Sequence, residues 1–265
     1  MSIEKPFHRN YRPLVEAPNS GYSSWKYIAD HNYAENPTQY TRAFCMIQSD
    51  LQKIFEYIEP ADINLQTYSH RIHQLLVRTC IEVEANFKAI LSENIYSKSG
   101  DLNRNDYKII NVTHHLSGYK IKMPYWTGSK NCFEPFKNWG NNDGSGKLSW
   151  YDAYNDTKHD RNKNFKESSF ENLLNAVSAL LIILTSQFGS YNFEPGNIVL
   201  STGEKGYFKG NFGIGSYMMI TEPSDWTEDE KYNFDWTTLS QQSDRFSKIN
   251  YDEIKNQVEK KKSIE

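Results

Sequence analysis

The sequence predicts a mainly α-helical protein: an antiparallel bundle of four to five helices with a small glycine-rich C-terminal appendage of α/β or irregular structure. Two observations lead to this prediction. Apolar side chains recur at helical spacing in several segments between residues 37 and 189. Beyond those segments, glycines crowd residues 203–215, which is typical of turns between short strands.

The chain divides by composition into three zones. Residues 1–36 form an irregular N-terminal segment, rich in Pro, Asn, Ser and Tyr, that we expect to wrap around the surface. Residues 37–189 form the helical bundle, and residues 190–265 form the appendage. The appendage has three further features: a short apolar strand at Tyr217–Ile220, two tryptophans in acidic loops (Trp226 and Trp236) and a polar tail, Tyr251–Glu265, with the pattern of a frayed helix.

Two long helices are predicted in the first half of the bundle. In Thr38–Tyr57 the apolar residues follow helical spacing, and Pro60 closes the pattern. In Tyr68–Leu91 they form one continuous stripe, typical of a helix with one face in a core. Asp106–Leu116 is a weaker candidate for a fifth helix, and Lys120–Trp126, which contains a proline, is expected to be an extended connector.

Two more helices are predicted after residue 148, because two serines each precede an acidic residue by three positions. This is the spacing of a capping box, and the two pairs are Ser149 with Asp152 and Ser168 with Glu171. The helices therefore run over Trp150–Phe165 and Ser169–Phe188, with Gly189 as the left-handed stop. The apolar stretch Val177–Leu184 makes the second of them the expected centre of the core.

Composition favours a folded cytoplasmic protein. The 265 residues are 24% charged with a net charge of −3, which neither supports nor excludes a polyanionic partner, and 14% are aromatic. The three cysteines are widely spaced, so reduced thiols in the cytosol are more plausible than disulfides or a zinc site. We expect no membrane association, since the N-terminus lacks a signal-peptide core and Val177–Leu184 is too short to span a bilayer.

Several motifs do not match a cofactor or metal site. In residues 140–147, GNNDGSGK, the spacing of a phosphate loop is wrong by one residue, and Leu148 stands where Ser or Thr would bind magnesium. The glycines of residues 203–215 include no GxGxxG. His114 and His115 are adjacent, so regular structure would point their rings in different directions. We therefore expect no cofactor and no metal.

Ionisable side chains crowd the predicted helix Trp150–Phe165. Asn155 and His159 are four residues apart and share one helical face, while Tyr154 and Lys158 form a neighbouring row that reaches Arg161 at the next turn. An imidazole can take a proton from a ribose 2′-hydroxyl, and cations can stabilise charge on phosphate oxygens. The alternative is a solvated helix face whose charges pair with their neighbours.

The segment Tyr154–His159, YNDTKH, together with the order of the elements, resembles the HEPN superfamily over residues 38–189. This resemblance implies a small helical bundle, often dimeric, of the kind found in bacterial toxin–antitoxin and phage-defence systems. Many members are metal-independent ribonucleases. Asn155 and His159 match the polar and histidine positions of the family motif, and the resemblance implies that the active groove is shared between two subunits.

Tyr154 stands where the family motif has arginine. A tyrosine can donate a hydrogen bond but carries no positive charge at neutral pH. The cation could come instead from Lys158 or Arg161, or from Arg71 or Arg78 on the long second helix. The site could equally be a remnant that binds a nucleotide or a protein.

The prediction for function is RNA cleavage, or binding of RNA or a nucleotide, in bacterial stress or phage defence. His159 would be the general base or acid, Lys158 and Arg161 would bind phosphate, and Asn155 and Tyr154 would orient the site. The alternative is a non-enzymatic interaction protein, antitoxin-like or a scaffold subunit, that binds a partner protein. An open cluster would favour the first function and a buried cluster the second.

Overall fold

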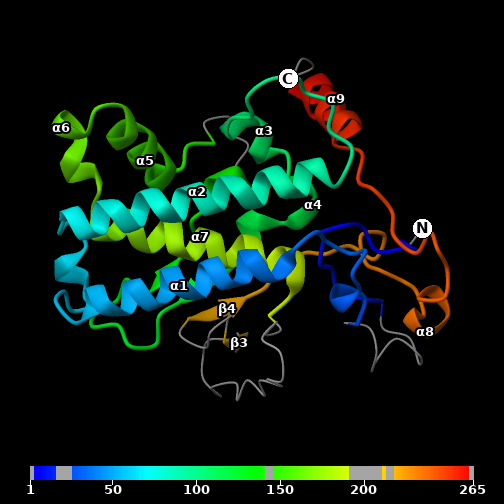
Figure 1. The fold of residues 1–265 in the computed structure, drawn as a ribbon, viewed down its shortest axis with the longest axis horizontal. Helices are drawn as coiled ribbons and strands as arrows, with labels where there is room; N and C mark the ends of the chain where they lie inside the picture. The colour runs from blue at the N-terminus through cyan, green and yellow to red at the C-terminus, as the bar shows by residue number, and fades with distance from the viewer. Residues whose placement is uncertain (1–2, 16–25, 141–145, 191–210, 213–217, 263–265) are drawn as a thin grey trace.

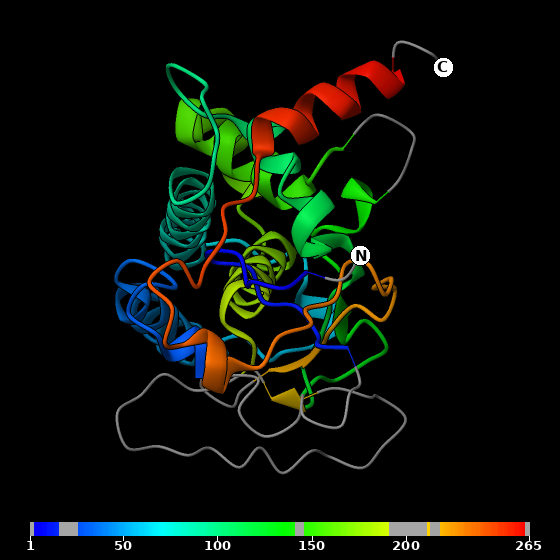
Figure 2. The same cartoon turned by 90° about the vertical axis from the view of Figure 1, so that its right-hand side faces the viewer.

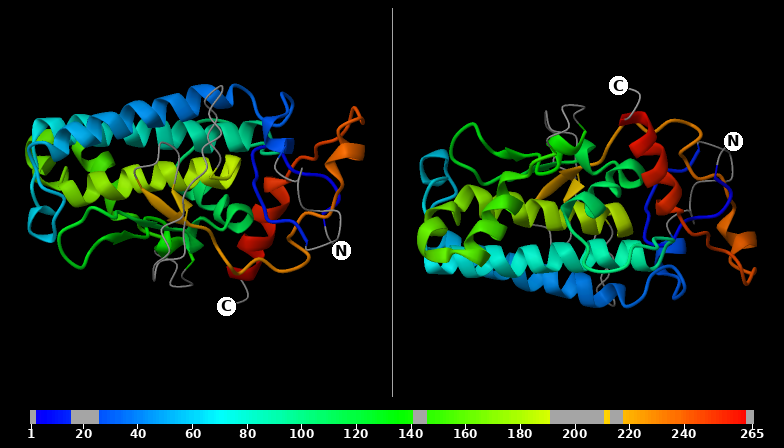
Figure 3. Two further views of the ribbon diagram at one scale, coloured as in Figure 1. Left: turned by 90° about the horizontal axis from the view of Figure 1, so that it is seen from below. Right: turned by 90° about the horizontal axis from the view of Figure 1, so that it is seen from above.

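The computed structural model describes residues 3–15, 26–140, 146–190, 211–212 and 218–262. The prediction of a mainly α protein is confirmed. Three long helices, α1 (Pro37–Phe55), α2 (His70–Ser92) and α7 (Phe170–Phe188), lie side by side, and α2 packs against both of the others (Figures 1 and 3). The shorter helices are α3 (Arg104–Lys108), α4 (Asn111–His114), α5 (Ser149–His159), α6 (Arg161–Asn164), α8 (Trp236–Leu239) and α9 (Tyr251–Lys262). Short 3-10 helices are η1 (Lys26–Ala29), η2 (Asp62–Asn64), η3 (Leu116–Gly118), η4 (Lys137–Trp139) and η5 (Phe165–Glu167).

Local sequence explains where α1 and α2 begin. Asn36 adopts a left-handed conformation (φ 49°) before Pro37, whose fixed φ suits the first turn of a helix. At the start of α2 the Ser69 hydroxyl accepts a hydrogen bond from the backbone N–H of Ile72 at 3.2 Å. Both helices lie within about two residues of their predicted bounds, because in each an apolar stripe coincides with a start signal, Pro37 in α1 and the Ser69 cap in α2.

Helix α7 is the most apolar element and is enclosed by the rest of the protein. Its N-cap is Ser169, whose hydroxyl accepts from the N–H of Asn172 at 3.2 Å, so the predicted capping box at Ser168 is wrong by one residue. Gly189 follows with φ 67° and ψ −170°, a positive φ but not the expected left-handed helical conformation. Among the described residues α7 is long and apolar enough to cross a membrane, but 83% of its apolar window is buried, as in the core helix of a soluble protein.

Helix α5 departs from the prediction at both ends. Leu148, not Ser149, is its N-cap, and no side chain caps it; the Leu148 side chain is buried. The predicted continuous helix Trp150–Phe165 is broken at Asp160, which leaves helical geometry (φ −143°, ψ 78°). The Asp160 carboxylate accepts from the N–H of Lys163 and caps α6 instead, an alternative that short acidic side chains offer the backbone.

A small antiparallel sheet joins distant parts of the chain. Its strand order is β2 (Cys132–Phe133), β1 (Lys120–Lys122), β4 (Met219–Thr221) and β3 (Asn211–Phe212). The expected connector Lys120–Trp126 therefore supplies an interior strand, whose Ile121 is opposite Phe133 on one side and Ile220 on the other. Tyr217, the first residue of the predicted strand, lies outside the described residues. Residues 141–145, in the segment that does not match a phosphate loop, and most of the glycine-rich stretch 203–215 also lie outside them.

The weak helix prediction Asp106–Leu116 corresponds to two short helices, α3 and α4. Asn103 and Asp106 form a capping box at the start of α3. His115 then ends α4 with a left-handed conformation (φ 49°), which the predicted uninterrupted helix does not allow. The chain therefore turns back toward the sheet after residue 115.

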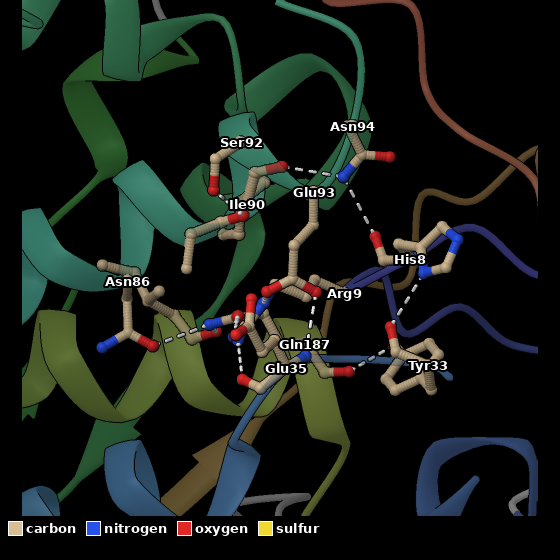
Figure 4. Close-up of polar contacts among 12 residues, drawn as sticks. His8, Arg9, Tyr33, Glu35, Asn86, Ile90, Ser92, Glu93, Asn94 and Gln187 are labelled. Carbon is tan, nitrogen blue, oxygen red and sulfur yellow. Dashed lines mark hydrogen bonds and ion pairs between the residues drawn. The ribbon is translucent and has the colours of Figure 1, made fainter. Parts of the chain in front are cut away.

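The N-terminal segment was expected to wrap around the surface, but part of it lies in the core. Arg9 and Asn10 are fully buried. The N–H of Tyr11 donates to the carbonyl of Ser186 near the end of α7 at 2.9 Å. Residues 3–15 also bond with residues 231–247, so the N-terminal segment lies beside the stretch of chain that precedes α9 (Figure 2). Figure 4 shows Arg9 at the centre of a polar network between this segment, α2 and α7.

Leu181→Ala should lower the free energy of unfolding by about 2 to 5 kcal/mol, because Leu181 is fully buried in α7 and truncation leaves a cavity. Ile81→Ala is the matched control, since Ile81 on α2 is 51% exposed and surface changes usually cost about 0.5 kcal/mol or less. Urea unfolding followed by circular dichroism measures both. A loss for Leu181→Ala below about 1 kcal/mol would contradict the position of α7 in the core.

Candidate functional site

Helix α5 and the start of α6 carry the five candidate residues, four of them on the side that faces away from the core. Its inner side packs against α2 and α7, and the Trp150 indole N–H donates to the carbonyl of Pro135 at 3.0 Å. The inner residues are Trp150, Tyr151, Ala153, Tyr154 and Thr157, all buried. Of the five candidates, Tyr154 is therefore on the buried side, whereas Asn155 is half-buried and Lys158, His159 and Arg161 are exposed.

Tyr154 is 1% exposed, and it contacts the exposed side chain of Lys158. The Lys158 ammonium donates to the Tyr154 hydroxyl oxygen at 3.2 Å and lies 5.2 Å from the centre of its ring. Burial raises the pKa of Tyr154, and the hydrogen bond to Tyr154 raises the pKa of Lys158. At neutral pH the phenol therefore stays uncharged and the lysine stays positive.

Asn155 and Lys158 line a polar groove between α2, α3 and α5 with a volume of about 560 Å³. Most of its charged side chains come from elements other than α5: Glu84 and Lys88 from α2, Asp101 before α3, and Arg104 at the start of α3. The groove therefore combines carboxylates, cations and amides, the side chains that bind a polar ligand.

Internal contacts occupy two of the carboxylates in the groove. Arg104 forms an ion pair with Asp152, and the Tyr151 hydroxyl donates to Glu84 Oε1 at 2.8 Å. Lys88 and Lys158 form no ion pair with a carboxylate within the described ranges. These two ammonium groups are the cations that an anionic ligand would meet in the groove.

His159 and Arg161 lie beyond the groove. His159 is one turn after Asn155 on the same face of α5, and its ring has neither a hydrogen bond nor an ion pair with any residue that the structure describes. Arg161 follows the break at Asp160 and lies near His73, whose pKa its charge helps to lower. The structure thus brings Tyr154, Asn155 and Lys158 together, and places the other two candidates at the adjacent end of α5.

The two arginines of α2 do not line the groove. Arg78 forms an ion pair with Asp50 of α1 at 2.6 Å, and Arg71 is exposed near the start of α2. Besides burial, the negative charge of Glu84 raises the pKa of the Tyr154 phenol. A cation for this end of α5 can therefore come from Lys158 or Arg161.

The adjacent histidines lie in different surroundings. His114 is fully buried, and its Nε2–H donates to the carbonyl of Arg9 at 2.8 Å. His115 stacks on Trp226 with 3.9 Å between ring centres and lies 3.1 Å from carboxylates of Asp225 and Glu230. Within the described ranges, no group of three His, Cys, Asp or Glu side chains is arranged to hold a metal ion.

Sequence reasoning missed the groove residues outside α5. Glu84 and Lys88 are four residues apart and share one face of α2, which was an available signal that α2 has a polar face. Arg104 had no such signal, because only the packing of α3 against α5 brings it to Asp152. No family model, no curated protein and no solved structure matches this chain.

Proposed function

We propose that the chain is a HEPN-like protein that binds RNA and cleaves it without a metal. Its scaffold would be an antiparallel four-helix bundle of α1, α2, α5 and α7. Contacts between α5 and α2 support this arrangement. Tyr151, near the start of α5, bonds Glu84 in the second half of α2, whereas Arg161, just after α5, lies near His73 at the start of α2. α5 therefore runs opposite to α2.

The other pairs of helices agree with alternating directions. Asn36 and Gln39, at the start of α1, line a pocket with Ser92, at the end of α2, so these helices run in opposite directions. α7 runs with α2, because Ser169 lies beside Tyr68 and Gln187 bonds Asn86. Up-down-up-down order is the usual topology of a four-helix bundle.

The observation that carries the proposal is the openness of the candidate cluster. Lys158, His159 and Arg161 are exposed, and Asn155 faces the groove. A solvent-facing row of cations with an unpaired imidazole suits a phosphodiester better than a sealed junction between helices does. In this proposal His159 transfers protons, Lys158 and Arg161 bind phosphate, Asn155 orients the substrate, and Tyr154 positions Lys158.

The assembly and setting follow from the same resemblance. We propose a cytoplasmic homodimer in which a second copy completes the groove, with a role in a toxin–antitoxin system or phage defence. The dimer would bring two copies of α5 together and double the number of cations at the substrate. Both copies carry tyrosine where the family motif has arginine, so the cations at a shared groove would be Lys158 and Arg161 of each copy.

A second candidate function is supported by Tyr154. Its ring is buried beside Glu84, so the position that carries the family's catalytic cation contributes no exposed charge. A chain of this kind could bind RNA or a partner protein without cleaving anything. An antitoxin-like or scaffold function is therefore the second candidate, and it predicts binding without cleavage of RNA.

Lys158→Ala should weaken binding of a single-stranded RNA and reduce the slope of log affinity against log salt by about 0.7, the value for one phosphate contact on a single strand. Lys53→Ala is the control, because Lys53 is an exposed lysine on α1 that pairs with Asp50. Fluorescence anisotropy with a labelled oligonucleotide measures the affinity of both variants. The salt concentration is varied from about 50 to about 200 mM, because phosphate contacts change the affinity strongly over this range.

The binding and cleavage results together separate the two functions. RNA binding with normal salt dependence and measurable cleavage would support the nuclease. Binding without cleavage would favour the non-enzymatic function. If the wild type binds no RNA, or if Lys158→Ala and Lys53→Ala give the same slope as the wild type, the proposed phosphate contact at Lys158 is wrong.

A further inference from the structure

Four aromatic rings gather where the start of α2 meets the turn after α6. Phe165 lies at their centre: its ring centre is 4.7 Å from that of His70, 5.5 Å from that of Tyr68 and 6.0 Å from that of His73. In Figure 1, α6 and the start of α2 lie at the same end of the molecule. We call these four side chains the aromatic cluster.

The aromatic cluster has an inner and an outer part. Phe165 and His73 are half-buried, whereas His70 is exposed and Tyr68 is 51% exposed. The buried Nδ1 of His73 has no hydrogen-bond partner among the described residues, so ring packing holds this imidazole in place. Phe165 and His73 thus pack beneath two rings that are exposed to solvent.

Positive charge lies next to these open rings. Arg161 is one helical turn before Phe165, and its charge, after burial and together with His70, lowers the pKa of His73. Lys166 follows Phe165 directly and is exposed. The nearby Asp160 carboxylate forms an exposed ion pair with Lys163 at 3.2 Å.

Open aromatic faces beside cations are the arrangement with which proteins hold single-stranded nucleic acid. Each base has a flat π face that stacks on an aromatic ring, and the phosphates that join the bases lie along the cations. The cluster also adjoins Arg161, which the proposed function already assigns to phosphate.

We propose that Tyr68 and His70 stack bases of single-stranded RNA, with Phe165 as their support and Arg161 on the connecting phosphate. This inference rests on the proposed RNA-binding function and adds a base-stacking subsite to it. In this arrangement the bound RNA runs from the groove beside α5, past His159, to the start of α2.

The test compares two probes on the same variants. One is a fluorescein-labelled oligouridylate with 2′-O-methyl groups, which cannot be cleaved through a 2′-hydroxyl; the other is an oligomer of the same length without bases. Tyr68→Ala and His70→Ala should each weaken binding of the oligouridylate by about 5- to 150-fold, the usual effect of losing one stacked base. Neither should change binding of the abasic oligomer.

Three control variants distinguish stacking from other effects. Tyr68→Phe keeps the ring and should retain wild-type affinity. Tyr57→Ala removes a tyrosine that is 86% exposed at the end of α1 and should change nothing. Arg161→Ala should weaken binding of both probes, because both carry phosphates. Thermal unfolding of each variant, followed by circular dichroism, verifies that the fold is intact.

The outcomes separate this inference from the proposed cleavage. If RNA is bound and cleaved but Tyr68→Ala and His70→Ala bind oligouridylate as the wild type does, the subsite is wrong and the nuclease stands. If binding depends on Tyr68 but natural RNA is never cleaved, the subsite stands and the nuclease is wrong. If the wild type binds the two probes equally well, stacking makes no contribution and the inference is overturned.

Discussion

His159→Ala should slow cleavage of single-stranded RNA by about 10²- to 10⁴-fold, the usual effect of removing one proton-transfer group. The free energy of unfolding should not change, because the His159 side chain is exposed and makes no hydrogen bond or ion pair within the part of the chain that the structure describes. This separation between activity and stability is what distinguishes a catalytic residue from a structural one. His31→Ala is the control, since its side chain is also exposed and lies on another part of the chain.

Single-turnover cleavage in the presence of a chelator, with the products resolved by mass spectrometry, measures this effect. Attack by the 2′-hydroxyl on the adjacent phosphorus breaks the bond to the 5′-oxygen, so one product should end in a 2′,3′-cyclic phosphate and the other in a free 5′-hydroxyl. Equal rates for His159→Ala and His31→Ala would remove His159 from the mechanism. Products with a 3′-hydroxyl and a 5′-phosphate would show a different reaction.

The helices were predictable where one local pattern decides them. α1, α2 and α7 each combine an apolar stripe with a start signal at the same place, so periodicity and capping agree. α5 shows the opposite case. The sequence pattern predicted one helix that continues past Asp160. Helix α5 instead ends before this residue, because the Asp160 side chain caps the new helix α6.

Pairing between distant segments could not be read from the sequence. Lys120–Lys122 is too short to show an alternating pattern, and it becomes a strand because Met219–Thr221, about a hundred residues later, bonds to it. Arg9 lies in a polar segment that predicted a surface position. Its burial depends on acceptors that α2 and α7 supply.

The candidate site was partly predictable for the same reason. Helical spacing correctly placed Asn155 and His159 on one face, and Tyr154 beside Lys158. Spacing alone did not reveal which face of the helix is buried. The Tyr154 ring, which was expected to orient the site, lies beneath the surface. The aromatic cluster combines residues 68–73 with residue 165, a contact that no local pattern encodes.

Arg9→Met should lower the free energy of unfolding by about 3 kcal/mol, the lower end of the cost of removing one partner of a buried ion pair, because Arg9 is fully buried and its partner Glu93 is 17% exposed. The Arg9 guanidinium is fully buried and donates to Glu93 at 2.5 Å, to Gln187 at 2.9 Å and to the carbonyl of Glu35 at 2.5 Å (Figure 4). It also lies 4.7 Å from the centre of the Tyr40 ring. Methionine fills similar volume but satisfies none of these acceptors.

Two comparisons separate the unpaired charge from a general effect of substitution. Arg78→Met removes an arginine whose pair with Asp50 is exposed, and exposed pairs contribute about 1 kcal/mol or less. Arg9→Met combined with Glu93→Met should cost less than Arg9→Met alone, because no carboxylate is then left without its partner. Backbone strain does not confound the comparison: residue 9 has φ 53°, and arginine and methionine pay a similar cost there. Urea unfolding of the four proteins gives the free energies, and equal losses for Arg9→Met and Arg78→Met would show that the Arg9 network does not hold the N-terminal segment in the core.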